Sequence, residues 1–367
     1  MEDTKKKSRG KVLVGMSGGV DSSVAAYLLM KEGYEVTGCT MRLYDYTGIG
    51  LPESNTCCSI KDVNDARSVC DTLGIPFMAL NFMADFRKEV MNRFIQEYLD
   101  GRTPNPCIDC NRRMKFGKMW QRARELGFDY IATGHYVRKF EKDGRWYLQK
   151  GVDITRDQSY VLYPMEQDMI AHTLFPLGGL IKKTEVRKIA EEQGFVNAHK
   201  HDSEDICFVP DGDYAGMIER VTGKTEGPGN LVTTEGKILG KHKGAIHYTI
   251  GQRRGLGLAV PEPVYVLSKD MSSNTVTVGS PDLLMKKELT GDDWFWMRKE
   301  PVPGESFRAS AKIRYRKPEA PAEITMEENG TCHIVFDEEQ RAISPGQAVV
   351  LYDGDTVIGG GTILSAE

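Results

Sequence analysis

The sequence predicts an α/β protein: an N-terminal domain built on a parallel sheet, a small β-rich central domain and a C-terminal β-barrel. Three observations support this. Strand-like and helix-like segments alternate through the first half, glycine and proline become frequent after about residue 210, and short β-rich runs dominate from residue 231 onward. The predicted domains are residues 1–213, 214–282 and 283–367, and 367 residues are enough for two or three domains.

The first half supplies the parallel sheet. Short apolar runs predict strands, and segments with apolar residues at helical spacing predict helices that mostly end at glycine. Such alternation implies parallel strands joined by crossover helices, and ligands bind at the carboxyl ends of these strands. The predicted strands are residues 11–16, 34–43, 75–81 and 128–133, and the predicted helices are residues 21–32, 63–73, 86–99 and 116–126.

The second half supplies the β-rich domains. Long helical patterns are not predicted after about residue 210, and the apolar runs become strand-length. Runs of this kind, separated by turn residues, are typical of a sandwich or barrel. The predicted strands there are residues 264–267, 275–278, 306–313, 332–336 and 348–352.

Composition excludes several protein classes. A hydrophobic content of 40% and a charged content of 27% are ordinary for a soluble globular protein. The apolar runs are far shorter than the ~20 residues of a membrane helix, and the charged N-terminus lacks the apolar stretch of a signal peptide. A cytoplasmic protein is therefore expected. Its eight cysteines indicate reduced thiols, metal ligands or redox catalysis rather than a disulfide framework.

The net charge of −4 is not that of a typical nucleic-acid binder, but binding depends on local patches. Residues 236–257 contain five lysines and arginines and no acidic residue, and residues 312–317 form a second basic segment. Tyr315 lies between Arg314 and Arg316, which combines charge with a stacking surface suited to RNA. Both segments are more often solvated faces in proteins, but their composition favours phosphate contacts.

The sharpest local signal is a glycine-rich string between the first predicted strand and helix, here called the phosphate loop. Glycines let the backbone approach an anion closely, and the following helix presents N–H groups and a positive dipole end. The string lacks the Gly-Lys-Ser/Thr of a Walker loop, so a standard kinase or GTPase site is excluded. The alternative is a turn that only shapes the corner. The string reads Gly15-Met16-Ser17-Gly18-Gly19-Val20-Asp21-Ser22-Ser23.

The phosphate loop resembles the PP-loop of the ATP pyrophosphatase superfamily. Members of that superfamily cleave ATP to AMP and pyrophosphate, and adenylate an oxygen so that a nucleophile can displace AMP. The resemblance implies ATP as substrate, with Asp21 helping to organise Mg²⁺ around the pyrophosphate. Because the superfamily includes GMP and argininosuccinate synthetases as well as tRNA-modifying enzymes, the acceptor stays open at this point.

Three cysteines bear on the acceptor. Cys107 and Cys110 form a C-x-x-C pair that we expect in a proline-bounded turn before a helix, and Cys207 follows about a hundred residues later. A C-x-x-C pair can be a redox pair, half of a zinc site or two coincidental thiols. A structural zinc would need a fourth ligand, which His199 or His201 near Cys207 could supply.

Further strings, in a shared order that makes coincidence negligible, identify the family. The chain closely resembles the MnmA family of tRNA-specific 2-thiouridylases over nearly its whole length. Besides the phosphate loop, the matching strings are Gly101-Arg102-Thr103-Pro104-Asn105-Pro106, Ala132-Thr133-Gly134-His135-Tyr136, Asp157-Gln158-Ser159-Tyr160, Ile206-Cys207-Phe208, Tyr248-Thr249-Ile250-Gly251-Gln252-Arg253-Arg254-Gly255-Leu256-Gly257 and Arg314-Tyr315-Arg316.

The resemblance implies both the reaction and its partners. ATP adenylates the C2 oxygen of the wobble uridine in tRNAs for glutamate, glutamine and lysine, and sulfur then replaces that oxygen with release of AMP and pyrophosphate. A separate donor protein supplies persulfide sulfur. The architecture it implies is a PP-loop domain of the adenine nucleotide alpha hydrolase-like class, a central domain and a tRNA-binding β-barrel.

The resemblance also implies the site residues. Cys207 would carry the persulfide, and Cys110 would release its sulfur by forming a disulfide with Cys207. The nucleotide would be held by Gly15, Met16, Ser17, Gly18, Gly19, Val20, Asp21, Ser22, Met41 and Gly134. The tRNA would be contacted by Asn105, Pro106 and Cys107 beside the target base and by His135, Arg156, Asp157, Gln158, Arg314, Tyr315 and Gln347.

Cys107 departs from one common form of the family, in which aspartate precedes the catalytic cysteine by three residues. An aspartate can act as a base or orient the uracil edge, and a thiol would do either differently. Alternatively, Cys107, Cys110 and Cys207 would ligate an iron–sulfur cluster whose open iron binds the transferred sulfur. The sequence leaves the persulfide and cluster routes open.

The remaining cysteines and the competing functions complete the predictions. Cys39, Cys70 and Cys332 lie in strand or helix patterns and are expected in the core, and the Cys57-Cys58 pair has no assigned role. A PP-loop ligase or amidotransferase acting on a metabolite would leave Cys110, Cys207 and the basic half without a role. A non-catalytic RNA-binding protein is disfavoured because the phosphate loop and both cysteines are intact.

Overall fold

The computed structural model describes residues 8–44, 60–180, 183–201, 206–209 and 211–367. The chain divides into two compact units, each built from separate stretches of sequence. The first unit comprises Met1–Val90, Cys107–Gly212 and Asp355–Val357, and the second comprises Met91–Pro106, Asp213–Gly354 and Ile358–Glu367. Within the described ranges, no helix has the length and apolar character needed to cross a membrane.

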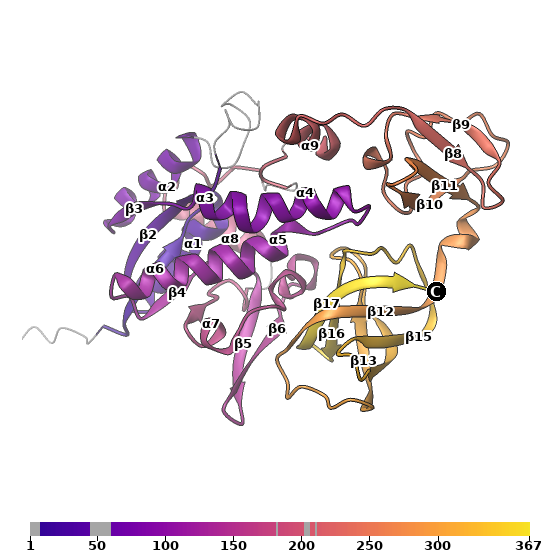
Figure 1. The fold of residues 1–367 in the computed structure, drawn as a ribbon. Helices are drawn as coiled ribbons and strands as arrows, with labels where there is room; N and C mark the ends of the chain where they lie inside the picture. The colour runs from indigo at the N-terminus through magenta and orange to yellow at the C-terminus, as the bar shows by residue number, and fades with distance from the viewer. Residues whose placement is uncertain (1–7, 45–59, 181–182, 202–205, 210) are drawn as a thin grey trace, which may run out of the picture. The chain divides into compact units, whose positions relative to one another are not determined.

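A five-stranded sheet with the order β3-β2-β1-β4-β7 organises the first unit (Figure 1). Every neighbouring pair in it is parallel. Val12, Leu13 and Val14 of the central strand are fully buried, as expected when helices cover both faces of a parallel sheet. The strands are β1 (Lys11–Gly15), β2 (Glu35–Arg42), β3 (Phe77–Asn81), β4 (Tyr130–Ala132) and β7 (Thr173–Leu174).

Helices of the first unit pack on this sheet through apolar side chains. Val24 and Leu29 of α1 share a buried cluster with Val12 and Val14 of β1 and Val69 of α2. The chain leaves α1 through Gly33, whose φ of +91° favours glycine, and Tyr34 then donates its N–H to the Leu29 carbonyl. These helices are α1 (Val20–Lys31), α2 (Ile60–Leu73), α7 (Gln167–Ala171) and α8 (Lys183–Glu192), with short 3₁₀ turns at Ile154–Arg156 and Ser159–Leu162.

Two helical stretches are longer and less regular than predicted. The first runs through α3 (Met83–Phe86), a π-helical turn (Arg87–Met91) and α4 (Asn92–Leu99). The second begins at Pro106 rather than residue 116 and runs through α5 (Pro106–Asp109), a π-helix (Cys110–Lys118) and α6 (Met119–Glu125). Proline suits a first helical position because the N–H it lacks would have no helical acceptor. The predicted turn at Cys107 and Cys110 is therefore wrong, since both residues lie within the helical stretch.

A hairpin that the sequence analysis did not predict follows the fourth strand of the sheet. It pairs β5 (Val137–Lys142) with β6 (Arg145–Lys150) in antiparallel register and extends from the first unit in Figure 1. Asp143 and Gly144 between the strands have φ angles of 52° and 74°. Positive φ at both central residues is typical of a type I′ turn, whose twist matches that of the strands.

Besides α4, the second unit contains a further helix and a small four-stranded sheet before the barrel. The sheet has the order β10-β11-β8-β9, and Leu231, Val266, Val276 and Val278 form part of its buried cluster. The helix α9 (Tyr214–Thr222) is a short element that the sequence analysis missed. The strands are β8 (Gly229–Val232), β9 (Ile238–His242), β10 (Tyr265–Asp270) and β11 (Thr275–Gly279), with 3₁₀ turns at Ala245–His247 and Pro281–Leu284.

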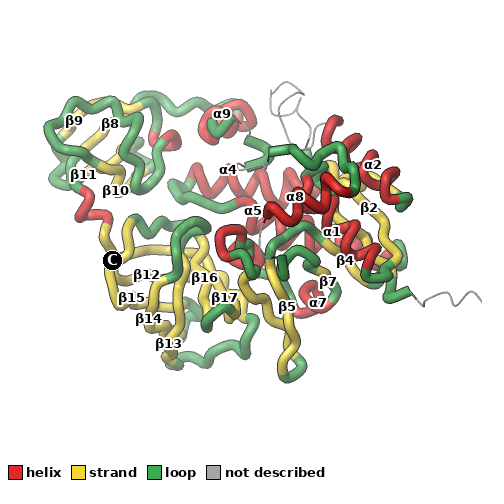
Figure 2. Tube along the Cα trace, turned by 180° about the vertical axis from the view of Figure 1, so that it is seen from behind, coloured by secondary structure: helices red, strands yellow, loops and turns green. Residues whose placement is uncertain are grey.

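The last six strands close into a barrel, seen from behind in Figure 2. Their order is β12-β15-β14-β13-β16-β17, and β12 also pairs with β17, so these six strands form a closed ring. Thr356 at the start of β17 also pairs with Gln149 of β6. Ile324, Ile334, Phe336 and Leu351 lie in its core. The strands are β12 (Met285–Trp296), β13 (Ser306–Lys312), β14 (Ala320–Met326), β15 (Cys332–Arg341), β16 (Ala348–Asp353) and β17 (Thr356–Ala366). The predicted fold class is confirmed.

Candidate active site

The phosphate loop lies where β1 ends and α1 begins, at the carboxyl end of the central strand. Gly18 has a φ of +76°, and a Cβ there would lie 2.5 Å from the Asp62 carbonyl oxygen, so the position requires glycine. Ser22 and Ser23 each donate a hydroxyl hydrogen bond to the Gly19 carbonyl at 3.1 Å. Because the first-turn N–H groups of a helix have no intrahelical acceptors, this corner suits a phosphate group.

Gly134 closes one side of the loop. A Cβ at Gly134 would lie 2.8 Å from the backbone carbon of Asp21 and 2.8 Å from the backbone nitrogen of Ser22, so only glycine permits this approach. On the adjacent strand, Met41 lies near the carboxyl end of β2, and Thr40 donates its hydroxyl to the Met16 carbonyl at 2.8 Å. The structure thus gathers the predicted nucleotide residues around one end of the sheet.

Asp21 is held by two side chains that the sequence analysis did not assign. Lys183 Nζ lies 2.5 Å from each carboxylate oxygen of Asp21, and the Tyr136 hydroxyl donates to Oδ1 at 2.7 Å. The Lys183 side chain is only 10% exposed and its ammonium lies 5.8 Å from the Tyr136 ring centroid. Asp21 therefore positions a buried ammonium beside the phosphate loop.

A second lysine supports the other side of the loop. Lys200 Nζ donates to the Gly18 carbonyl at 3.1 Å and to Asp65 Oδ2 at 2.8 Å, and it also contacts Asp62. Burial opposes the charge of Lys200, but hydrogen bonds to the two aspartates outweigh it and raise its pKa. Asn197 donates to the Gly18 carbonyl and to Ser23 Oγ, both at 3.0 Å. These residues lie far from the loop in sequence and belong to no motif that could have indicated them.

The two cysteines of the C-x-x-C pair lie in one helical stretch but differ in exposure to solvent. Cys107 in α5 is exposed, whereas Cys110, at the start of the π-helix, is only 9% exposed. The neighbouring Asn111 is buried and donates Nδ2–H to the Val161 carbonyl at 3.1 Å. π-Helical turns are uncommon and often occur at functional sites. Cys107 and Cys110 thus lie three residues apart in one helical stretch, the first exposed and the second buried.

Cys207 is held through its backbone and its neighbour. The Tyr44 hydroxyl donates to the Cys207 carbonyl at 2.7 Å. Phe208 is buried, with its ring centroid 5.6 Å from that of Phe86, which in turn lies 5.9 Å from the Tyr44 ring. The Cys207 thiol is half-buried. An aromatic cluster of Tyr44, Phe86 and Phe208 thus holds the backbone at Cys207 and the residue after it.

The cysteines do not assemble into a metal centre in the described part of the chain. No group of three or more Cys, His, Asp or Glu side chains there lies close enough to hold a metal ion. Cys107, Cys110 and Cys207 form no disulfide in the structure, and neither do the other described cysteines. The Cys57-Cys58 pair lies outside the described residues. The arrangement therefore matches neither the zinc alternative nor a preformed three-cysteine cluster site.

The prediction that the other cysteines are core residues is confirmed. Cys39, Cys70 and Cys332 are fully buried. Burial raises the pKa of Cys39 to about 12, that of Cys70 to about 11 and that of Cys332 to about 12. Thiols with such pKa values are inert at neutral pH.

The predicted tRNA-contacting segments of the first unit have strong internal contacts. His135 is buried, its Nδ1 lies 2.7 Å from Thr133 Oγ1, and burial together with the nearby Lys115 lowers its pKa well below the usual range. Asp157 accepts the Gly151 and Ser159 N–H groups, and Gln158 Oε1 accepts the Tyr136 N–H at 3.0 Å. Asp157 and Gln158 thereby shape the chain that presents Tyr136 to Asp21, while Arg156 is exposed.

The remaining predicted tRNA residues belong to the second unit. Arg314 donates to the Ala342 carbonyl at 2.9 Å, to Ser344 Oγ at 2.8 Å and to the Ile250 carbonyl at 3.4 Å. Gln347 donates to the Thr103 carbonyl at 2.6 Å, next to the segment that carries Asn105 and Pro106. Tyr315 is 36% exposed. Arg314 thus links three backbone segments while its neighbour Tyr315 presents a ring to solvent.

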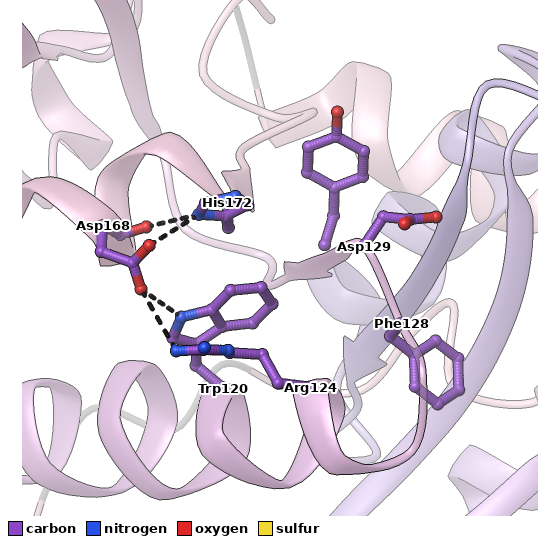
Figure 3. Close-up of a pocket in the computed structure, with 7 residues that line it drawn as sticks. Trp120, Arg124, Phe128, Asp129, Asp168 and His172 are labelled. Atoms are coloured by element: carbon purple, nitrogen blue, oxygen red, sulfur yellow. Dashed lines mark hydrogen bonds and ion pairs between the residues drawn. The ribbon is translucent and has the colours of Figure 1, made fainter.

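A surface pocket lies elsewhere in the first unit, at the amino ends of β1 and β4 rather than at the phosphate loop (Figure 3). Asp168 accepts the Trp120 indole N–H at 2.8 Å and lies 3.2 Å from His172 Nδ1, and the Trp120 and His172 rings stack at 4.8 Å. Asp129 accepts the Lys11 N–H at 2.8 Å. These contacts connect the starts of the strands. The polar residues that line the pocket therefore have a structural role that needs no ligand.

Family comparisons cover almost all of the chain. Residues 10–211 match the family described as tRNA methyl transferase HUP domain. Residues 216–280 match the tRNA methyl transferase PRC-barrel domain, and residues 286–363 match the aminomethyltransferase beta-barrel domain.

Individual relatives match over nearly their full length. The protein named tRNA-specific 2-thiouridylase MnmA from Geotalea uraniireducens is 48% identical, over 99% of this chain and 97% of the relative. The proteins of the same name from Clostridioides difficile and Acetivibrio thermocellus are 48% and 49% identical, over 96% and 97% of this chain and 98% and 99% of theirs. Among solved structures, a 4-thiouridine synthetase–RNA complex with bound ATP is 18% identical, over 55% of this chain and 45% of that one, with a TM-score of 0.35.

Proposed function

Because this chain belongs to the MnmA family of tRNA-specific 2-thiouridylases, we propose that it is an ATP-dependent sulfurtransferase that converts a wobble uridine of tRNA to 2-thiouridine. The observation that carries this proposal is an identity of 48% over 99% of the chain to a relative of that name. The phosphate loop at the carboxyl end of β1 supports the use of ATP, since a helix start that lacks side-chain capping suits an anion.

The first step activates the uridine. Its C2 oxygen attacks the α-phosphorus of ATP, the bond to the β-phosphate oxygen breaks, and pyrophosphate leaves. The N–H groups that open α1 bind the phosphates, and Lys183 neutralises charge that develops on the departing pyrophosphate. This step is needed because a carbonyl oxygen is a poor leaving group, whereas AMP is a good one.

The second step transfers sulfur. A persulfide on Cys207 attacks C2 through its outer sulfur, and AMP departs with the original oxygen. The Cys110 thiolate then attacks the inner sulfur, which breaks the persulfide S–S bond and leaves the outer sulfur on C2. Cys110 and Cys207 are thereby oxidised to a disulfide, and an external dithiol reduces it before the next turnover. The half-buried Cys207 and the 9% exposed Cys110 are the assigned pair.

A step is assigned to Mg²⁺ or to an iron–sulfur cluster only where the arrangement of side chains suits that group. Both oxygens of Asp21 accept hydrogen bonds from Lys183, so Asp21 anchors a lysine in this arrangement and no step is assigned to Mg²⁺ there. The described cysteines likewise form no three-residue group for a metal, so no step is assigned to an iron–sulfur cluster. The cluster route is the competing hypothesis for the sulfur-transfer step.

The partners follow from the same family. The substrate tRNAs are those for glutamate, glutamine and lysine, and the sulfur comes from a persulfide-carrying donor protein in the cytoplasm. Asn105, Pro106 and Cys107 would lie beside the target base. The contacts along the tRNA would come from His135, Arg156, Asp157, Gln158, Arg314, Tyr315 and Gln347.

The decisive experiment is ATP–pyrophosphate exchange measured with and without tRNA, followed by analysis of the tRNA nucleosides. We expect exchange that depends on tRNA and formation of 2-thiouridine when a persulfide donor is added. Exchange that instead requires a small metabolite would identify a ligase. The absence of exchange under all conditions would identify a non-catalytic RNA-binding protein and overturn the proposal.

A further inference from the structure

We propose that one face of the β5–β6 hairpin binds RNA and contacts the tRNA substrate, an inference that rests on the proposed function. The hairpin holds five lysines and arginines and two acidic residues. It also carries three aromatic side chains, Phe140, Trp146 and Tyr147. Proteins bind single-stranded nucleic acids with basic side chains that contact the phosphates and aromatic side chains on which the bases stack.

The strand register sorts these residues onto two faces. Opposed residues in an antiparallel pair point to the same side, and alternate residues along each strand share a side. Phe140 is opposite Tyr147, and Lys142 is opposite Arg145. The distal basic face, defined as Phe140, Lys142, Arg145 and Tyr147, therefore combines two rings and two cations without an acidic residue.

The opposite face of the hairpin packs onto the first unit. Lys139 donates to the carbonyl oxygens of Ile170 and Ala171 at the end of α7, both at 2.7 Å. Its ammonium also lies 4.3 Å from the Trp146 ring centroid, and its cross-strand partner Leu148 is fully buried. Because this face is used for packing, the hairpin is held with the distal basic face turned away from α7.

The distal basic face is preorganised for stacking. The Phe140 and Tyr147 rings are stacked, with centroids 5.3 Å apart and planes 18° apart, and both are half-buried. The type I′ turn at Asp143-Gly144 fixes the tip, where Lys142 is exposed. Because the two rings are already stacked before binding, a base can stack on them with little further loss of side-chain entropy.

The root of the hairpin lies between segments that the proposed function assigns to tRNA. His135 precedes β5, and Arg156, Asp157 and Gln158 follow β6 within a few residues. Asp157 accepts the N–H of Gly151, the residue directly after β6, and Gln158 binds the Tyr136 backbone just before β5. The distal basic face thus extends the assigned tRNA-contacting segments along a rigid two-stranded arm.

Contacts at the base of the β5–β6 hairpin limit which of its residues can belong to the RNA-binding surface. Arg138 lies 3.5 Å from Asp355, and Gln149 donates to Thr356 at 3.4 Å, all within the first unit. These two residues are therefore already engaged, and the RNA surface is restricted to the four residues beyond them. A polyanion with exposed bases fits that set, because its phosphates can pair with Lys142 and Arg145 and its bases can stack on the Phe140–Tyr147 pair.

The test measures tRNA affinity of the full-length protein as a function of salt. Lys142→Glu with Arg145→Glu should weaken binding at least tenfold near physiological salt and reduce the log–log salt slope by roughly 1 to 2. Phe140→Leu with Tyr147→Leu should weaken binding about tenfold and leave the slope unchanged, because stacking releases no counterions. If charge reversal unfolds the protein, Lys142→Gln with Arg145→Gln tests the same charges.

A matched control makes the same change in net charge at exposed positions on helices of the first unit, away from the hairpin. Lys31→Glu with Lys188→Glu meets that requirement and should bind tRNA like the wild type. Hairpin variants that fold and bind tRNA no differently from this control would overturn the inference. A wild-type protein that neither binds nor thiolates tRNA would instead overturn the proposed function, so the two failures are distinguishable.

Discussion

Lys183 Nζ donates hydrogen bonds to both carboxylate oxygens of Asp21 at 2.5 Å, although 162 positions separate the two residues in the sequence. The contact places a buried ammonium at the start of α1, where the helix dipole already favours an anion. Asp21 binds the ammonium directly, while Tyr136 donates its hydroxyl to Asp21 and lies with its ring centroid 5.8 Å from the ammonium. We infer that Asp21 acts on ATP chiefly by positioning Lys183.

Lys183→Met should therefore weaken ATP binding by about ten- to a hundredfold, the range expected for losing a hydrogen bond to a charged group. Titration calorimetry with ATP measures this directly. Lys188→Met on the exposed side of α8 is the matched control and should bind ATP like the wild type. Equal ATP affinity in the two variants would remove Lys183 from the nucleotide site.

Gly134→Ala should abolish ATP binding while the fold is kept. The added Cβ would meet the backbone of Asp21 and Ser22 at 2.8 Å, and neither atom can move without displacing the phosphate loop. Gly179→Ala is the control, because a Cβ at that exposed position has no neighbour within 4 Å. Circular dichroism should show both variants folded, and retained ATP binding in Gly134→Ala would contradict the assigned approach.

Cys110→Ser and Cys207→Ser should each abolish thiolation and leave tRNA binding largely intact. Serine cannot carry a persulfide or release one, whereas the contacts to tRNA do not require either thiol. Cys332→Ala in the barrel core is the control and should thiolate normally after a modest loss of stability. Nucleoside analysis provides the measurement, and thiolation by either serine variant would exclude that cysteine from the reaction.

Arg314→Ala should weaken tRNA binding and flatten its salt dependence, since it removes a charge. It should also lower the melting temperature, because the side chain bridges Ser344 and the carbonyls of Ala342 and Ile250. Ser344→Ala separates the two effects, as it removes a partner of Arg314 and keeps the charge. An Arg314→Ala variant with the wild-type salt slope would show that Arg314 has only a structural role.

His135 should make the folded protein less stable in mild acid. Burial, aided by Lys115, lowers the pKa of His135 well below the ordinary value of 6.5, so the unfolded chain takes up a proton that the folded chain refuses. Stability is thus lost as the pH falls through about 6.5. The melting temperature should drop more steeply between pH 7 and pH 5.5 in the wild type than in His135→Gln, and parallel drops would contradict the assignment.

The sequence predicted the elements whose signal is local. The strands and helices from Lys11 to Asn81 carry strong periodicity and glycine ends, and the phosphate loop has a diagnostic string of its own. The β5–β6 hairpin escaped prediction because basic and aromatic residues interrupt its apolar alternation. The helix start at Pro106 escaped it because two prolines precede the cysteine pair there and resemble a turn.

The site residues that the sequence did not predict escaped prediction for a different reason. Lys183, Asn197 and Lys200 reach the phosphate loop only through the packing of distant segments against it. A lysine on an amphipathic helix usually faces solvent, so its residue type and spacing contain no information about such a contact. Only the folded arrangement shows which of the many lysines is buried against Asp21.

The most direct test of the central claim compares tRNA thiolation by rigorously iron-free protein with thiolation by cluster-reconstituted protein, both prepared anaerobically. Each sample receives ATP and tRNA with either a persulfide donor or inorganic sulfide. We predict that the iron-free protein forms 2-thiouridine from the persulfide donor and that Cys110 and Cys207 suffice. Thiolation by the reconstituted protein alone would contradict the disulfide route and make Cys107, Cys110 and Cys207 cluster ligands.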